Sequence, residues 1–223
     1  MKTNEEIKEW FDQLYDDMQK SLFSKKDIIW INSFTAIDSC IGAQNIKSDQ
    51  ISDANIILFY EFTNGLKITW ETKEKKKITF KAEGTFNLLP LEEVLTDNWD
   101  DSWADTWAGT EEAEAMVGFR PLDMFYESAG SVGFYVNRTD KTGLYLYKEE
   151  GVPEPLHIDL EAYLKLLAMS KGYGWWQNAL VEISTGVHQP NTDSFRENMP
   201  KIFPEFNWDE FVALYESLRI DKQ

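Results

Sequence analysis

Apolar residues near the start of the chain recur at the spacing of one helix face. Thr3 and Glu6 have the form of a capping box, and apolar positions follow at helical spacing: Ile7, Trp10, Phe11, Leu14 and Met18. The pattern predicts a helix that ends near Ser24. The next apolar run, Ile28 to Ile31, is short enough to be either a strand or a turn of helix.

A second helix and a hairpin are predicted from a change in period. Ser52 or Asp53 can cap the helix, and Gly65, which follows an asparagine, is a typical stop. From there the period becomes two, with one set of alternating positions on each arm: Leu66, Ile68 and Trp70, then Ile78, Phe80 and Ala82. The turn between the arms holds Lys73, Lys75, Lys76 and Lys77, which is more typical of a solvated turn than of a nucleic-acid site.

The second half of the chain alternates short helical and sheet-like patterns. Leu91 to Leu95 predicts a helical turn, and sheet-like patterning resumes at Phe119. Ser131 to Asn137 and Thr142 to Lys148 are typical of a second hairpin. Asp159 is expected to cap the helix that follows.

A final helix is expected after Asn207, with Phe211, Leu214, Tyr215 and Leu218 on one face. Helices near both ends with hairpins between them favour the α+β class. We expect an antiparallel or mixed sheet with helices packed mainly on one side and extra helices at the C-terminal end. Pro153 and Pro155 mark a loop and not a linker, so a single domain over residues 1–223 is predicted.

The segment from Asp97 to Glu114 combines three tryptophans, four residues apart, with seven acids and no base. On a helix the indoles would form one stripe with carboxylates beside it. That stripe either covers one side of the sheet while the acids face water, or lies partly exposed as the anchor of a protein interface. The carboxylates are the stronger candidates within the predicted partner-binding residues, which are Asp97, Asp100, Asp101, Asp105, Glu111, Glu112, Glu114, Trp99, Trp103 and Trp107.

The formal net charge of −17 is concentrated in the second part of the chain. Residues 1–90 carry 12 Lys and Arg against 14 Asp and Glu, whereas residues 91–223 carry 10 against 25. An acidic surface repels nucleic-acid phosphates and speeds association with basic proteins, although it also serves solubility alone. We therefore expect a basic protein partner and no nucleic acid.

Compartment and membrane contact follow from the same composition. No run approaches the roughly 18 apolar residues of a membrane span, so no membrane partner is expected. Cys40 is the only cysteine and excludes an intramolecular disulfide, and the acidic start from Met1 to Glu9 is unlike a signal peptide. A reducing, cytoplasmic location is the expectation.

Few residues suit catalysis or cofactor binding. His157 and His188 are the only histidines, and they lie 31 residues apart without a paired cysteine, so no metal site is expected. The stretch from Gly130 to Gly133 is too short for a phosphate-binding loop and lacks its Lys-Ser or Lys-Thr ending. We expect no catalytic residue, no cofactor and no enzyme activity, with a carboxylate-based hydrolase as a minor alternative.

Two adjacent tryptophans follow the interruption Gly172-Tyr173-Gly174. Neighbours on a helix cannot both face one core. We expect one of Trp175 and Trp176 to be buried and the other to lie near a groove or under the C-terminal residues, and the favoured interpretation is that residues 190–220 cover both.

The chain resembles the SMI1/KNR4, or SUKH, superfamily in the order of its features. These are the Asn64-Gly65 step after a helix, the strand from Leu66 to Thr72, Phe119-x-Pro121, the hairpin that begins at Ser131, and the helix that ends near Gly172-Tyr-Gly-Trp-Trp176. The resemblance covers about residues 51–183 and implies structural roles only. They are Gly65 at the helix-to-strand turn, Trp70 facing inward, Pro121 before the later sheet, and Gly130 with Gly133 at its entry.

Many bacterial members of that family are immunity proteins that bind and silence a toxin, often a nuclease, whereas fungal members are regulatory interaction proteins. The resemblance therefore implies a non-enzymatic immunity-type protein that occludes the active surface of a basic toxin. A regulatory scaffold with an endogenous partner is the alternative. Around the core, the chain adds a helix at 4–24, an enlargement from Asp97 to Val117 and a C-terminal helical arm at 186–223. The oligomeric state stays open.

Overall fold

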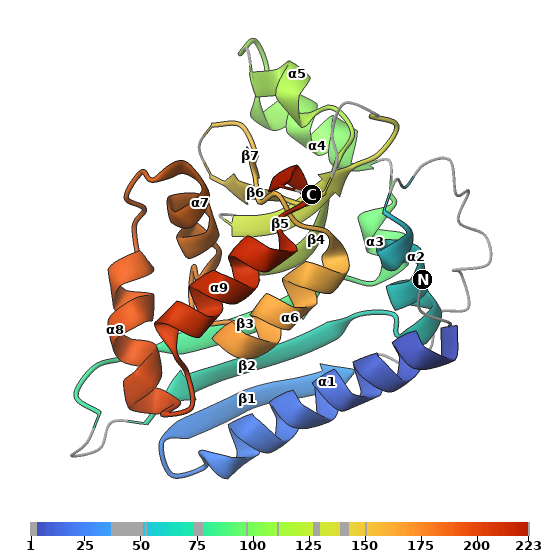
Figure 1. Ribbon diagram of the computed structural model, residues 1–223. Helices are drawn as coiled ribbons and strands as arrows, with labels where there is room; N and C mark the ends of the chain where they lie inside the picture. Colours follow the sequence, from blue (N-terminus) through green and yellow to red (C-terminus); the bar gives the residue numbers. More distant parts are fainter. Residues whose placement is uncertain are drawn as a thin grey trace. The chain divides into compact units, whose positions relative to one another are not determined.

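The computed structural model describes residues 4–36, 51, 53–73, 78–96, 98–110, 112–126, 130–138, 143–149 and 151–222. The chain is α+β with an antiparallel sheet, as predicted (Figure 1). It comprises two compact units. The first holds residues 1–35, 67–86 and 161–219, and the second holds residues 36–66, 87–160 and 220–223. The expectation of a single domain stays a prediction.

The first unit combines sheet strands with the helices from both ends of the chain. Its elements are α1 (Asn4–Ser24), β1 (Ile29–Ala36), β2 (Leu66–Thr72), the start of β3 (Glu83–Leu88), α6 (Leu160–Ser170), α7 (Gln177–Thr185), α8 (Thr192–Ile202) and α9 (Trp208–Leu218). Helix α1 runs alongside β1 (Figure 1). The predicted N-terminal helix and C-terminal helical arm are confirmed, and the run from Ile28 to Ile31 belongs mainly to a strand.

Local sequence explains two of these helix boundaries. Asn207 caps α9, because its side chain accepts hydrogen bonds from the backbone N–H groups of Asp209 and Glu210. Helix α7 ends at Gly186, whose φ of 72° closes the last turn in the left-handed conformation that glycine adopts without strain.

The predicted position of the second arm of the first hairpin, Ile78 to Ala82, is wrong. Ile78 is a single bridge residue, Phe80 is only half-buried, and β3 begins at Glu83. The hydroxyl of Thr72 accepts a hydrogen bond from Ala82 N (2.9 Å) and donates one to Phe80 O (3.2 Å). A side chain thus replaces part of the backbone ladder, which interrupts regular strand pairing. Lys75, Lys76 and Lys77 lie outside the described residues.

Aromatic rings fill the core of the first unit. Trp176 is 1% exposed and lies between Tyr163 of α6 and Phe211 of α9, with ring centroids 5.4 and 6.1 Å away. Trp70 on β2 is fully buried, as the alternation predicted, and its Nε1 donates to Lys171 O at 2.7 Å. The C-terminal helices therefore complete this core.

The second unit is a meander of antiparallel strands with short helices. Its elements are α2 (Ala54–Phe62), the end of β3, α3 (Leu91–Val94), α4 (Asn98–Thr106), α5 (Glu112–Met116), β4 (Phe119–Tyr126), β5 (Gly130–Tyr135), β6 (Tyr145–Lys148), β7 (Glu154–Pro155) and the 3₁₀ turn η2 (Ile220–Lys222). The strands from β3 to β7 pair in chain order. Asp53 caps α2, and β5 and β6 confirm the second predicted hairpin.

Two residues singled out in the sequence occupy other positions than expected. Pro121 lies inside β4, opposite Gly133, and not before the sheet. A register shift directly follows Pro121, which is how a strand accommodates a residue without an N–H. Gly133 lies in the middle of β5, where a Cβ would come within 2.3 Å of the Arg120 carbonyl oxygen.

Candidate functional site

The tryptophan segment folds as two short helices, with Trp99 and Trp103 on α4 and Trp107 in the turn directly after it. Trp99, Trp103 and Trp107 are all half-buried, and Trp99 and Trp103 stack with centroids 5.6 Å apart and planes at 19°. Trp103 and Trp107 pack on what we call the tyrosine cluster, which consists of Met116, Phe119, Tyr135, Tyr145 and Tyr147. The stripe therefore covers part of the second unit, with some surface of each indole still exposed.

Hydrogen bonds fix the indoles in addition to packing. Trp103 lies edge-on to Tyr147 at 5.3 Å, and its Nε1 donates to Phe119 O at 3.1 Å. Trp99 Nε1 donates to Glu93 O at 2.6 Å. Because each of these two indoles has both a ring contact and a backbone acceptor, α4 is held in one orientation.

Asp100 is turned inward and bonded to a buried arginine. Its carboxylate accepts hydrogen bonds from both terminal nitrogens of Arg120, at 2.7 and 3.0 Å, and from Gly118 N at 2.9 Å. The Arg120 side chain is 5% exposed and the Asp100 side chain 42%. The hydrogen bonds from Arg120, helped by the one from Gly118, hold the pKa of Asp100 below its ordinary value, although partial burial opposes this. Asp100 thus ties α4 to β4.

Replacing Asp100 with asparagine is expected to lower the free energy of unfolding by about 1.5 kcal/mol at neutral pH, near the lower end for charge-assisted bonds because water reaches the carboxylate. A lowered pKa in the folded state stabilises the fold above the unfolded pKa of about 4, and this contribution disappears as the pH falls through the folded value. Urea unfolding at several pH values should therefore show a gap between parent and variant that is constant above about pH 5 and closes in acid.

The neighbouring substitution Asp101→Asn is the matched control, because Asp101 is exposed. It should leave the free energy of unfolding almost unchanged. A gap for Asp100→Asn that persists in acid would show that the pair with Arg120 is not its cause.

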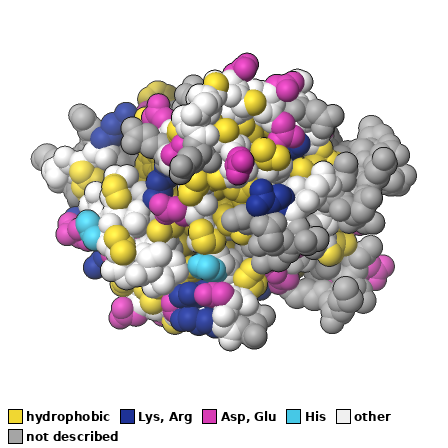
Figure 2. Space-filling view, turned by 90° about the horizontal axis from the view of Figure 1, so that it is seen from above, with side chains coloured by type: hydrophobic (Ala, Val, Ile, Leu, Met, Phe, Trp, Pro, Cys, Tyr) yellow, Lys and Arg dark blue, Asp and Glu magenta, His cyan; other side chains and the backbone are white. Residues whose placement is uncertain are grey.

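The remaining described carboxylates of the segment face water. Asp101, Asp105 and Glu114 are exposed, and Glu112 is half-buried. We call these four the acidic face; Asp97 and Glu111 lie outside the described residues. Figure 2 shows the molecule from above relative to Figure 1. On that face, acidic side chains lie among hydrophobic ones, together with some basic and histidine side chains. Val117, directly after α5, is exposed and adds apolar surface next to Glu114, and carboxylates mixed with apolar groups suit a protein partner better than a small ion.

Each of the two histidines lies beside a carboxylate from outside the tryptophan segment. His188 is exposed and lies 3.1 Å from a Glu182 carboxylate oxygen, and His157 lies 3.8 Å from Asp221. Within the described ranges no group of three or more His, Cys, Asp or Glu residues could hold a metal ion. Cys40 lies outside them. None of the helices in the described ranges combines the length and the apolar character that crossing a membrane requires.

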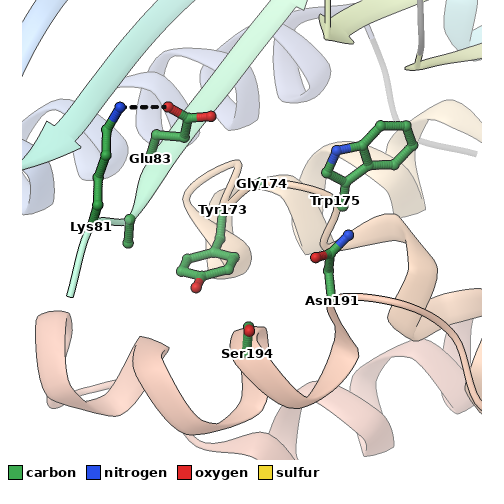
Figure 3. A pocket seen from close by; sticks show the side chains of 8 residues that line it. Lys81, Glu83, Tyr173, Gly174, Trp175, Asn191 and Ser194 are labelled. Carbon is green, nitrogen blue, oxygen red and sulfur yellow. Dashed lines mark ion pairs between the residues drawn. The ribbon is translucent and has the colours of Figure 1, made fainter.

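One further feature was missed in the sequence: a pocket in the first unit between β3, the turn after α6 and the start of α8 (Figure 3). As expected, one of the adjacent tryptophans, Trp176, is buried, and the other, Trp175, lines this pocket; cover of both by residues 190–220 stays a prediction. Only the interruption by Gly172 and Gly174 signalled it in advance.

Comparison with known proteins adds no relative. No family model, no curated protein and no solved structure matches the chain. The resemblance to the SMI1/KNR4 superfamily stays a prediction from the order of sequence features.

Proposed function

We propose that this chain is a non-enzymatic, immunity-type binding protein that neutralises a basic protein toxin by covering its active surface. The acidic face on α4 and α5 would make the first contact. One observation carries the proposal: α4 divides into an indole side packed on the tyrosine cluster and a carboxylate side directed to water. The SMI1/KNR4-like order of features supports the immunity-type role.

Charge supports a basic partner over other classes. Residues 91–223, which include the acidic face, carry 25 Asp and Glu against 10 Lys and Arg. Such a surface raises the rate at which a basic protein arrives, and it repels the phosphates of nucleic acid. Neutralising a toxin requires tight binding and no turnover, so the absence of an evident nucleophile and base pair in the sequence is consistent with this role.

Rigid presentation supports the choice of this particular surface. Asp101 and Asp105 are separated by one helical turn on α4, whose Trp103 is bonded and packed. A charged surface that does not need to be ordered on binding loses less conformational entropy. The packed indoles thus hold the carboxylates of α4 in fixed positions.

The double variant Asp101→Lys with Asp105→Lys tests the assignment. We expect its association rate with the toxin encoded by the neighbouring gene to fall about tenfold or more at low salt, and the difference to shrink at high salt, because screening acts on exposed charges. Stopped-flow mixing at two ionic strengths measures both quantities. A scaffold with an endogenous partner is indicated instead if the neighbouring gene encodes no toxin.

A matched control separates the local face from net charge. Glu9→Lys with Asp12→Lys makes the same change in total charge on exposed positions of α1. It should slow association much less, about threefold or under, because steering depends on where the charge lies. Equal slowing by both double variants would reject the acidic face as the contact surface.

A further inference from the structure

The pocket of the first unit is built on a loop that is bonded to the sheet along its length. Gly172 O accepts a hydrogen bond from Thr85 N at 2.8 Å, and Gly174 N donates to Glu83 O at 2.9 Å. Tyr173 forms an antiparallel bridge with Gly84 between these bonds. The loop is therefore an added length of sheet, and the groups that it presents are fixed in position.

Two residues in the pocket wall hold an unfavourable backbone. Trp175 has a φ of 60° and Asn191 a φ of 67°. Asparagine tolerates the left-handed region, but a bulky residue such as tryptophan does so only at a cost of about 1–3 kcal/mol. Strain of this kind is concentrated at binding sites, where the chain keeps a side chain in place despite the cost.

The first turn of α8 contributes polar groups on the opposite wall. Asn191 occupies the N-cap position of α8, yet its side chain makes no capping hydrogen bond. Its amide lies in the pocket wall together with the Ser194 hydroxyl (Figure 3). The amide therefore offers a donor and an acceptor to the pocket in place of a role in the helix.

The third wall carries charges of both signs. Lys81 Nζ lies 3.9 Å from a carboxylate oxygen of Glu83, and both side chains are largely exposed. Because the two charges cancel and the whole chain carries −17, a phosphate or another anion is disfavoured. The volume of about 300 Å³ is at the lower end for ligand pockets and suits a single ring.

The directions of the two aromatic side chains in the pocket favour one of two classes of uncharged ligand ring, a nucleobase or a sugar. Tyr173 and Trp175 leave the chain in different directions on either side of Gly174, so they do not form a slot with two parallel walls (Figure 3). A nucleobase has two flat faces and few polar edge atoms, which suits such a slot. A sugar ring can place a C–H face against a single indole and has hydroxyl groups around its rim.

We propose that this pocket binds a neutral sugar ring, with its C–H face against Trp175 and its hydroxyls bonded to Asn191, Ser194 and the Lys81–Glu83 pair. This pocket shares no residue with the acidic face, and the proposal does not depend on the proposed toxin binding.

Saturation-transfer NMR and calorimetric titration of the full chain with glucose, galactose, mannose and N-acetylglucosamine test the proposal. At least one sugar should bind with a Kd of about 1 mM, because a single ring in an open site offers few atoms. No binding of any of the four at about ten times that concentration would overturn it. Adenosine serves as the competing probe, and binding of adenosine in place of the sugars would overturn the assignment to carbohydrate.

Trp175→Gly and Asn191→Gly locate the site at two positions where glycine suits the backbone. Glycine adopts a positive φ without strain, which offsets part of the packing lost with the half-buried Trp175 indole, and Asn191→Gly, at an exposed position, should fold as well as the parent chain. Each should weaken sugar binding by about tenfold, through loss of the indole face or of the amide. Trp30→Thr, which removes a 61% exposed indole on β1, is the control and should bind normally. Undiminished binding by Trp175→Gly would place the sugar elsewhere.

Discussion

Trp103→Ala is expected to lower the free energy of unfolding by about 2–3 kcal/mol, somewhat less than for a fully buried tryptophan. The substitution removes the ring contacts with Trp99, Phe119 and Tyr147 and the hydrogen bond to Phe119 O. Urea unfolding followed by circular dichroism measures the loss. Because the tyrosine cluster then lacks its cover, α4 should detach before the rest of the second unit unfolds.

Trp103→Phe should cause a smaller loss in the free energy of unfolding than Trp103→Ala. It keeps an aromatic ring but removes the Nε1 donor, so a smaller loss of about 1 kcal/mol is expected. The alanine variant should also bind a basic partner more weakly, although it retains every carboxylate, because a detached helix must be ordered again on binding. Unchanged affinity would mean that the orientation of α4 contributes nothing to recognition.

Gly172→Ala is expected to cost at least about 3 kcal/mol or to prevent folding of the first unit. A Cβ at this position would lie 2.1 Å from the Phe86 ring and 2.8 Å from Thr85 O, while φ is 63°. Neither neighbour can yield easily, since one is a buried ring and the other is backbone. The hydrogen bonds that fasten the pocket loop to β3 would be lost with the fold of this turn.

Gly186→Ala isolates the steric part of that cost. Gly186 has a similar φ of 72°, but a Cβ there would meet nothing within 4 Å. Its loss should be about 1 kcal/mol, which is the backbone cost alone. Thermal unfolding of the two variants side by side gives the difference, and equal losses would show that the approach of Phe86 is unimportant.

Sequence patterns correctly predicted the elements that depend on neighbouring residues, such as helix caps and the periodic spacing of apolar side chains. The spacing of Trp99, Trp103 and Trp107 indicated a one-sided stripe, and Asn207 and Asp53 marked helix starts that their side chains do cap. The second arm of the first hairpin was misplaced because the alternation at Ile78 to Ala82 is opposed by the Thr72 side chain. No pattern of hydrophobic positions records such a side-chain bond.

The features that the sequence did not predict depend on contacts between segments that are distant in the chain. Asp100 was grouped with its acidic neighbours, yet its partner Arg120 is 20 residues away on another element. The pocket likewise brings together Glu83, Trp175 and Ser194, which no spacing rule connects. Trp175 has a positive φ between two residues whose N–H groups are bonded, Gly174 to Glu83 O and Trp176 to Tyr173 O, and its residue type gives no sign of this.

The route of the chain through its two units limits how this protein can change in evolution. The chain passes from one unit to the other after residues 35, 66, 86, 160 and 219. Neither unit is a continuous stretch, so a single recombination point in the gene would leave both without some of their strands or helices. Partner choice is therefore expected to diversify through substitutions and through short insertions in loops, and not by exchange of whole modules.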